Sequence, residues 1–310
     1  MVVSQVLLAA SRRPALRRVV TGTPATRRVV DRFVAGENLD DALAVVRTLT
    51  GDGLAVTLDH LGEDVTDRAE AVRSRDAYLA ALAAVAPLGL GRRVEVSVKL
   101  SAFGQALPDG GHDVALEMVR PVVEAASAQG TTVTLDMEES RTVDSTLAVL
   151  AELRQEHPAT GAVLQAMLHR TEGDAKLLAA PGSRVRLVKG AYREPAAVAH
   201  QGRREVDAAY VRCLEVLMAG PGYPMVGSHD PAMIEHARRL ARAERRNPDS
   251  WEIQMLHGIR PDEQRRLLAN GFQVRVYTPY GIDWYGYFMR RLAERPANLR
   301  FFLRSLATKS

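Results

Sequence analysis

The chain has 310 residues, of which 46% are hydrophobic and 25% are charged, so it is long enough for one large domain with a sizeable core. No apolar run approaches the about 20 residues that a membrane-spanning helix needs. Cys213 is the single cysteine, which excludes an internal disulfide and a cysteine-based metal site.

The net charge of +4 is concentrated at the N-terminus. Residues 1–30 contain six arginines and no acidic residue, whereas residues 31–310 carry a net charge of −2. We expect residues 1–50 to form a helical N-terminal arm, with residues 48–53 (TLTGDG) as a turn before the first strand. Because the arm is rich in arginine and poor in acids, its composition also fits a transit peptide.

Short apolar or β-branched runs then recur along the chain, between segments with helical periodicity such as 112–129, 203–219 and 231–246. In chain order the predicted strands are 54–59, 94–100, 132–137, 162–168, 184–189, 224–228, 251–256 and 272–278. This alternation predicts a (β/α)8 barrel over residues 51–310, since such a barrel needs about 250 residues. A doubly wound open sheet is less well supported, because it usually has a G-x-G-x-x-G turn after its first strand, and this chain has none there.

Polar residues lie near the ends of all eight predicted strands, and (β/α)8 barrels place their chemistry at the C-terminal ends. Buried polar groups are costly unless they are paired, so this set predicts a polar pocket. Some members could instead cap the following helix, as Asp230 before Pro231 indicates. The set is Asp59, His60, Lys99, Ser101, Asp136, Glu138, Glu139, Gln165, His169, Arg186, Lys189, Ser228, His229, Asp230, Gln254, His257, Arg275 and Tyr277.

Lysine is rare in this chain, because only Lys99, Lys176, Lys189 and Lys309 accompany its many arginines. Lys99 and Lys189 both end predicted strands, which suggests point contacts to an anion or a Schiff base. The histidines at strand ends show no HxH or HExxH spacing, so no metal site is expected.

Aromatic residues and arginines gather in the last predicted helix, residues 284–294. Tyr287, Arg290, Arg291 and Glu294 share one face of this helix at the spacing i, i+3, i+4 and i+7. Adjacent guanidinium groups can bind a carboxylate or phosphate bidentately, so this face predicts an anion clamp. A solvated face with Arg–Glu pairs is the alternative.

These segments together resemble the proline dehydrogenase family, flavin enzymes that oxidise L-proline to Δ1-pyrroline-5-carboxylate. The resemblance runs in order from about residue 55 to 305, with one block per strand. The blocks are VSVKLSAFG (96–104), TLDMEES (134–140), LQAMLHRT (164–171), RVRLVKGAYRE (184–194), VGSHD (226–230), WEIQMLHGIR (251–260), VRVYTPYG (274–281) and YFMRRLAERPAN (287–298). It implies a distorted (β/α)8 barrel with FAD at the C-terminal rim and the last helix over the mouth.

The resemblance also implies residue roles. Lys99, Arg290 and Arg291 bind the proline carboxylate, Tyr277 and Tyr287 pack on its ring, and Glu294 pairs with the arginines. Asp136 belongs to the catalytic network, and Arg186 lies against flavin N5. The residues that line FAD are Met137, Gln165, Arg186, Lys189, Gly190, Ala191, Tyr192, Ser228, His229 and Gln254. Ser228 stands where the family has threonine, and Asp230 where it has asparagine.

Further expectations concern partners. The family passes electrons to a membrane quinone, so we expect a cytoplasmic protein with peripheral contact at the inner face of the plasma membrane, and pyrroline-5-carboxylate dehydrogenase as pathway partner. No nucleic-acid partner is expected. Two other hypotheses stay open. One is an aldolase or pyridoxal-phosphate barrel that uses Lys99 or Lys189, and the other is a binding module whose basic arm binds nucleic acid or lipid.

Overall fold

The structure is a computed structural model that describes residues 30–294, with side chains up to Met289. Its strands form one closed parallel barrel in chain order, and β8 pairs with β1 to complete it. The strands are β1 (Ala55–His60), β2 (Val94–Val98), β3 (Val133–Leu135), β4 (Gly161–Gln165), β5 (Arg184–Val188), β6 (Tyr223–Gly227), β7 (Glu252–Leu256) and β8 (Val274–Tyr280). The predicted (β/α)8 barrel is therefore confirmed.

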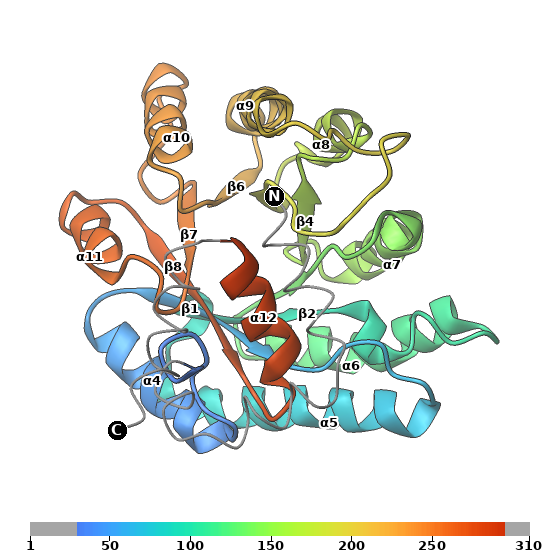
Figure 1. Cartoon of the computed structure of the whole chain (residues 1–310). Helices are drawn as coiled ribbons and strands as arrows, with labels where there is room; N and C mark the ends of the chain where they lie inside the picture. The colour runs from blue at the N-terminus through green and yellow to red at the C-terminus, as the bar shows by residue number, and fades with distance from the viewer. Residues whose placement is uncertain (1–29, 295–310) are drawn as a thin grey trace, which may run out of the picture.

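Helices surround the barrel, and all but the first and the last of those described occupy connections between strands (Figure 1). They are α4 (Leu39–Gly51), α5 (Arg68–Val85), α6 (Gly111–Ala128), α7 (Val143–Glu156), α8 (Thr171–Leu178), α9 (Arg203–Ala219), α10 (Pro231–Ala243), α11 (Pro261–Ala269) and α12 (Trp284–Glu294). Short 3-10 turns are η1 (Ala86–Leu88), η2 (Gly91–Arg93), η3 (Leu100–Phe103) and η4 (Ser140–Thr142).

Local sequence sets several of the helix starts. The Asp230 side chain accepts a hydrogen bond from the Ala232 N–H at 3.0 Å, and Pro231 follows it, so the predicted cap of α10 is confirmed. Asn38 caps α4 in the same way, since its Oδ1 accepts from the Asp41 N–H at 2.9 Å.

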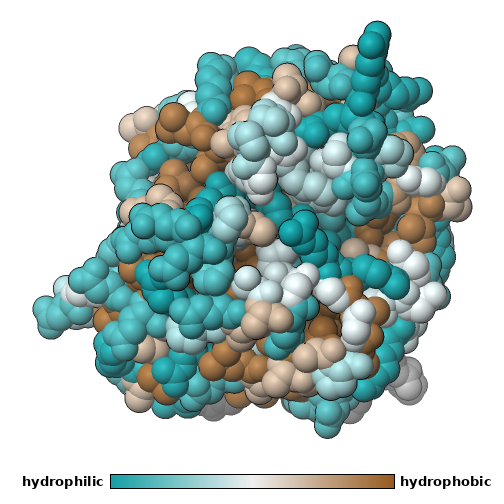
Figure 2. Space-filling model, turned by 180° about the vertical axis from the view of Figure 1, so that it is seen from behind, coloured by the Kyte–Doolittle hydropathy of each residue, from teal (hydrophilic) through white to brown (hydrophobic). Residues whose placement is uncertain are grey.

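The hydrophobic core lies between the strands and the surrounding helices. Outward-facing residues of the strands, such as Val56, Leu58 and Val96, are at most 1% exposed and pack against the buried faces of the helices. Of the large hydrophobic residues in the described part of the chain, Leu177, Val198 and Ile282 are exposed. The face seen in Figure 2 accordingly mixes hydrophilic residues with scattered hydrophobic ones.

The last helix, α12, crosses the barrel in the view of Figure 1 and has the predicted bounds. Over residues 30–294, no helix is both long enough and apolar enough to cross a bilayer. The six arginines of residues 1–30 lie outside the described residues. Within the arm, α4 continues to Gly51, so the turn predicted at 48–53 is wrong in its first part because those residues extend the helix.

Candidate active site

The interior of the barrel is filled by charged and polar side chains instead of the branched aliphatic residues that are usual there. Side chains alternate across a strand, so Glu95, Ser97 and then Lys99 follow one another on the inward face that begins in β2. The buried cations Lys99, Arg184, Arg186 and Arg275 are matched in number by the carboxylates of Asp59, Glu95, Asp136 and Glu252. Each charge therefore has an opposite charge nearby, as a buried charge requires.

We call the C-terminal ends of the strands the mouth of the barrel. Asp136 is the centre of a hydrogen-bonded cluster there. Its Oδ1 accepts from Arg186 Nη1 at 2.7 Å and from Ser97 Oγ at 2.8 Å, and its Oδ2 accepts from the Tyr277 hydroxyl at 2.6 Å. Burial, together with the Asp136 charge, raises the pKa of Tyr277 well above its ordinary value. Tyr277 therefore keeps its proton and can remain a donor.

Arg186 is held from several sides. Its Nε donates to Gln254 Oε1, its Nη1 donates to Ser97 Oγ at 3.0 Å, and its guanidinium carbon lies 5.2 Å from the centre of the Tyr277 ring. Because β5 places Arg186 opposite β2, β3 and β7, the orientation of this cation is fixed before any ligand binds.

Lys99 lies next to this cluster. Its ammonium group donates to both carboxylate oxygens of Asp59, at 2.8 and 2.9 Å, and lies 3.9 Å from Asp136 Oδ2. Burial alone lowers the pKa of Lys99, but Asp59 and Asp136 outweigh that effect and raise it above its ordinary value. Lys99 is therefore a cation at neutral pH, which does not suit a Schiff-base lysine, because such a lysine must lose its proton.

A second set of ion pairs lies beneath this cluster, nearer the N-terminal ends of the strands. Arg184 Nη2 donates to Glu95 Oε2 at 2.9 Å, and Arg275 Nε donates to Glu252 Oε1 at 2.7 Å. Glu95 Oε1 also lies 3.4 Å from Arg186 Nη2, so the lower set touches the upper one.

The structure corrects the prediction that placed Arg275 at the mouth. Its Nη2 donates to the Arg92 carbonyl at 2.9 Å, below the start of β2. Arg275 is the second residue of β8 and not near its end, because that strand continues to Tyr280, beyond the predicted limit of residue 278.

Polar groups also surround the mouth on the side of β5 to β7. Lys189 Nζ donates to Asp230 Oδ2 at 2.8 Å and to Asp207 Oδ1, so this cation ties the end of β5 to α9 and α10. His229 Nε2 accepts from the Leu256 N–H at 2.8 Å. The amide of Gln165 donates to the Glu138 carbonyl at 2.7 Å.

Comparison with known proteins gives the family of this chain. The family model described as proline dehydrogenase matches residues 42–304. The chain belongs to the proline dehydrogenase family. A proline dehydrogenase of Deinococcus radiodurans is 38% identical over 282 residues, which cover 90% of each chain.

Other relatives agree. Proline dehydrogenase 1 of Bacillus subtilis subsp. natto is 37% identical over 92% of each chain. The crystal structure of proline utilization A from Bdellovibrio bacteriovorus, inactivated by N-propargylglycine, has a TM-score of 0.79 and 26% identity, and the match covers 87% of this chain and 33% of that one. This member of the family is thus an oxidoreductase of proline catabolism, and the resemblance stated from the sequence is confirmed.

The structure brings many of the predicted site residues together. Lys99, Asp136, Arg186, Gln254 and Tyr277 form the connected cluster described above. Met137 belongs to an apolar cluster with Met167 and Leu168, against which Tyr192 packs. Ser228 and Gln165 are buried, Gly190 is half-buried, and Ala191 is exposed. The backbone of α12 carries Arg290, Arg291 and Glu294, but their side chains lie outside the described part of the structure, while Tyr287 is buried.

Sequence reasoning gave no role to several charged residues of the interior: Asp59, Glu95, Arg184 and Glu252. Asp59 was noted only as a strand-end residue. The other three lie at the start of a strand, or one residue after it, and not at the C-terminal ends where chemistry is expected in such a barrel. A detectable signal was present, because a charged residue at an inward position of an apolar strand must find a partner.

Proposed function

We propose that this enzyme oxidises L-proline to Δ1-pyrroline-5-carboxylate with FAD bound at the mouth of the barrel. The observation that carries the proposal is the cluster in which Arg186 and Tyr277 both donate to Asp136. It provides a fixed cation and a fixed carboxylate at the end of the barrel where such enzymes place their chemistry.

The residues present fit a flavin. Side chains of Met137, Met167 and Tyr192 can contact a ring system. The cations Arg186 and Lys189 lie nearby, but each already has carboxylate partners, so their contacts to the cofactor would be hydrogen bonds. In this proposal FAD is held by Met137, Gln165, Arg186, Lys189, Gly190, Ala191, Tyr192, Ser228, His229 and Gln254. The flavin supplies the acceptor for the hydride that leaves the ring carbon next to the proline nitrogen.

The protein's part is binding and orientation. In the proposal, Lys99, Arg290 and Arg291 hold the proline carboxylate, and Glu294 pairs with the arginines. Tyr277 and Tyr287 pack against the proline ring. Because Lys99 already has Asp59 as a partner, the arginines supply most of the uncompensated charge for the substrate carboxylate. Arg186 would stabilise the negative charge that a bound flavin gains on reduction, and Asp136 keeps Arg186 in place.

The electron acceptor is part of the same proposal. We place the reaction in the cytoplasm, with a quinone reached at the inner face of the plasma membrane and pyrroline-5-carboxylate dehydrogenase as the next enzyme. The family resemblance supports this part. Relatives such as the Bifunctional protein PutA of Escherichia coli, 28% identical over 92% of this chain and 25% of its own length, are compatible with it.

The deciding experiment is an anaerobic absorption spectrum of the purified full-length protein before and after L-proline is added. We expect a yellow protein whose flavin absorbance is bleached by L-proline, and not by L-valine, which has no ring to oxidise. A colourless protein that borohydride inactivates only in the presence of substrate would instead support the lysine-based aldolase and overturn the flavin proposal.

A further inference from the structure

The segment of residues 30–38, which we call the strap, lies between α4 and the mouth and packs against α12. Val30, Phe33 and Val34 of the strap share one hydrophobic cluster with Trp284 and Phe288 of α12. The rings of Phe33 and Phe288 have their centres 6.3 Å apart. The last helix is therefore supported by a part of the chain about 250 residues away in sequence.

Backbone contacts fix the strap to the loops of the barrel. The Ala35 N–H donates to the Pro279 carbonyl at 2.8 Å, and the Gly281 N–H donates to the Gly36 carbonyl at 3.0 Å. These two hydrogen bonds fix the strap to the end of β8, just before α12 begins. A Cβ added to Gly258, whose φ is +72°, would lie 1.6 Å from the Arg32 carbonyl oxygen. Position 258 must therefore be glycine for the strap to pack against this loop.

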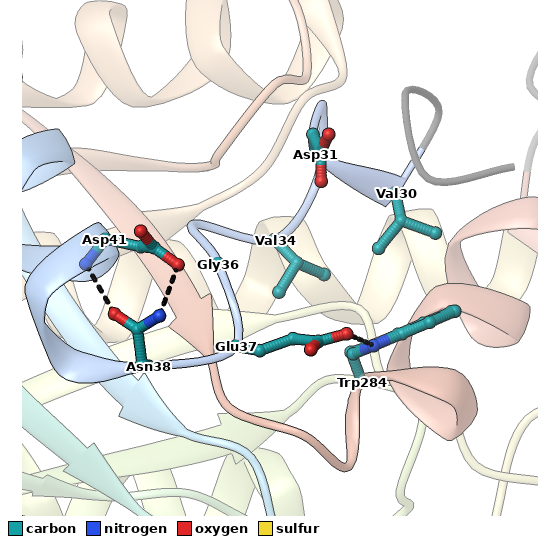
Figure 3. Close-up of a pocket in the computed structure, with 8 residues that line it drawn as sticks. All are labelled: Val30, Asp31, Val34, Gly36, Glu37, Asn38, Asp41 and Trp284. Atoms are coloured by element: carbon teal, nitrogen blue, oxygen red, sulfur yellow. Dashed lines mark hydrogen bonds between the residues drawn. The ribbon is translucent and has the colours of Figure 1, made fainter. Parts of the chain in front are cut away.

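One side-chain contact joins the strap directly to the first residue of α12. Trp284 Nε1 donates to Glu37 Oε1 at 3.1 Å, and Trp284 is only 5% exposed. Figure 3 shows the Glu37 carboxylate directed at the indole across the pocket that both segments line. A buried indole N–H without an acceptor is costly, so this bond selects one orientation of the Trp284 side chain.

We propose that Glu37 is a positioning residue for the substrate site: through Trp284 it fixes the start of α12 and so the placement of Arg290 and Arg291. The inference rests on the proposed function, in which these arginines hold the proline carboxylate. They lie on the same short helix as Trp284, about two turns further on. A helix this short transmits a change at its first turn to its later turns as a rigid rod.

The test compares Glu37→Ala, Trp284→Phe and the double variant in the full-length enzyme. Trp284→Phe keeps an aromatic ring in the cluster but removes the N–H donor. We expect each single variant to raise the KM for L-proline about five- to twentyfold and to change kcat less than twofold. The double variant should behave like Glu37→Ala, because Trp284→Phe removes a bond that Glu37→Ala has already removed.

A readout apart from turnover is the inhibition constant of cyclopentanecarboxylate, a ring carboxylate that has no nitrogen to oxidise. In the single variants this inhibition constant should rise in parallel with the KM for proline, while the flavin content stays unchanged. Glu37→Gln keeps an acceptor oxygen and should restore the wild-type KM.

The matched control is Asn38→Ala. Asn38 follows Glu37 in the strap and caps α4. Its side-chain hydrogen bonds join Asp41 and not α12 (Figure 3). We expect a lower Tm with an unchanged KM.

Two results would overturn the inference: an unchanged KM in Trp284→Phe, or additive effects in the double variant. Arg290→Ala separates this failure from failure of the proposed function. If Arg290→Ala raises KM while Trp284→Phe does not, only the role of Glu37 is wrong. If neither Arg290→Ala nor Arg291→Ala changes KM, the arginine clamp itself is wrong.

Discussion

Both carboxylate oxygens of Asp59 accept hydrogen bonds from the ammonium group of Lys99, inside a barrel where Asp59 is completely buried. Asp59 lies in β1 and Lys99 directly follows the adjacent strand β2, and the Tyr78 hydroxyl lies 3.3 Å from the same carboxylate. Because both groups are buried, the Asp59 carboxylate is the main group that offsets the cost of burying the Lys99 charge.

Removing this carboxylate should destabilise the fold. We expect Asp59→Asn to lower the free energy of unfolding at pH 7 by about 3–5 kcal/mol, because Lys99 is left as a buried charge without its main partner. Urea unfolding measures the change. The control is Asp144→Asn, since Asp144 pairs with Arg170 but its side chain is 86% exposed, and its loss should cost at most about 1 kcal/mol. Equal, small effects in both variants would contradict the importance of the buried pair.

Glu138 should make stability depend on pH. Burial raises the pKa of Glu138 from 4.5 to about 7, although Ser101 donates to its carboxylate. The folded state then holds the Glu138 proton more tightly than the unfolded state. The stability that protonated Glu138 contributes is therefore fully present below pH about 4.5 and is lost as pH rises through about 7.

The comparison for this residue is Glu138→Gln, which cannot titrate. Between pH 5 and pH 8 the wild type should lose about 2–3 kcal/mol of stability relative to this variant, as the two pKa values imply. Urea unfolding at the two pH values gives the difference. Glu139→Gln changes the neighbouring carboxylate, which is exposed, and should follow the wild type. If Glu138→Gln also followed the wild type, the assignment of the proton to Glu138 would be wrong.

The arginines of α12 should control substrate affinity. We expect Arg290→Ala and Arg291→Ala each to raise the KM for L-proline about 10- to 100-fold while FAD stays bound, because in the proposed function each arginine makes a charge-assisted hydrogen bond to the carboxylate. Steady-state kinetics and the flavin spectrum measure the two effects. Arg266→Ala, which removes an exposed arginine that pairs with Glu263 on α11, should leave KM unchanged. An unchanged KM in either α12 variant removes that arginine from the clamp.

Tyr277 should make the enzyme prefer proline over 4-hydroxyproline. Its ring is held by the bond to Asp136 and by the nearby Arg186 guanidinium, so it cannot easily move away from a larger substrate. We expect kcat/KM for L-proline to exceed that for 4-hydroxy-L-proline about tenfold or more, and Tyr277→Ala to narrow this ratio. Equal kcat/KM values for both substrates in the wild type would rule out this role.

The local pattern of the sequence determined much of the fold. Alternating strand and helix patterns were enough to give the order of elements, since hydrophobic periodicity is a local property. The cap at Asp230 and the bounds of α12 were also readable, because both depend on residues within one or two helical turns. The family resemblance then pointed to Lys99, Asp136, Arg186 and Tyr277.

Only the tertiary structure decided which side chains meet. Glu95 and Arg184 are 89 residues apart in sequence, and Glu37 and Trp284 are 247 apart. Their contacts exist because β8 pairs with β1, which closes the barrel, and because residues 30–38 lie beside α12. No local pattern records such a pairing, since the partner of a buried charge is set by strand order, register and the inward direction of each side chain.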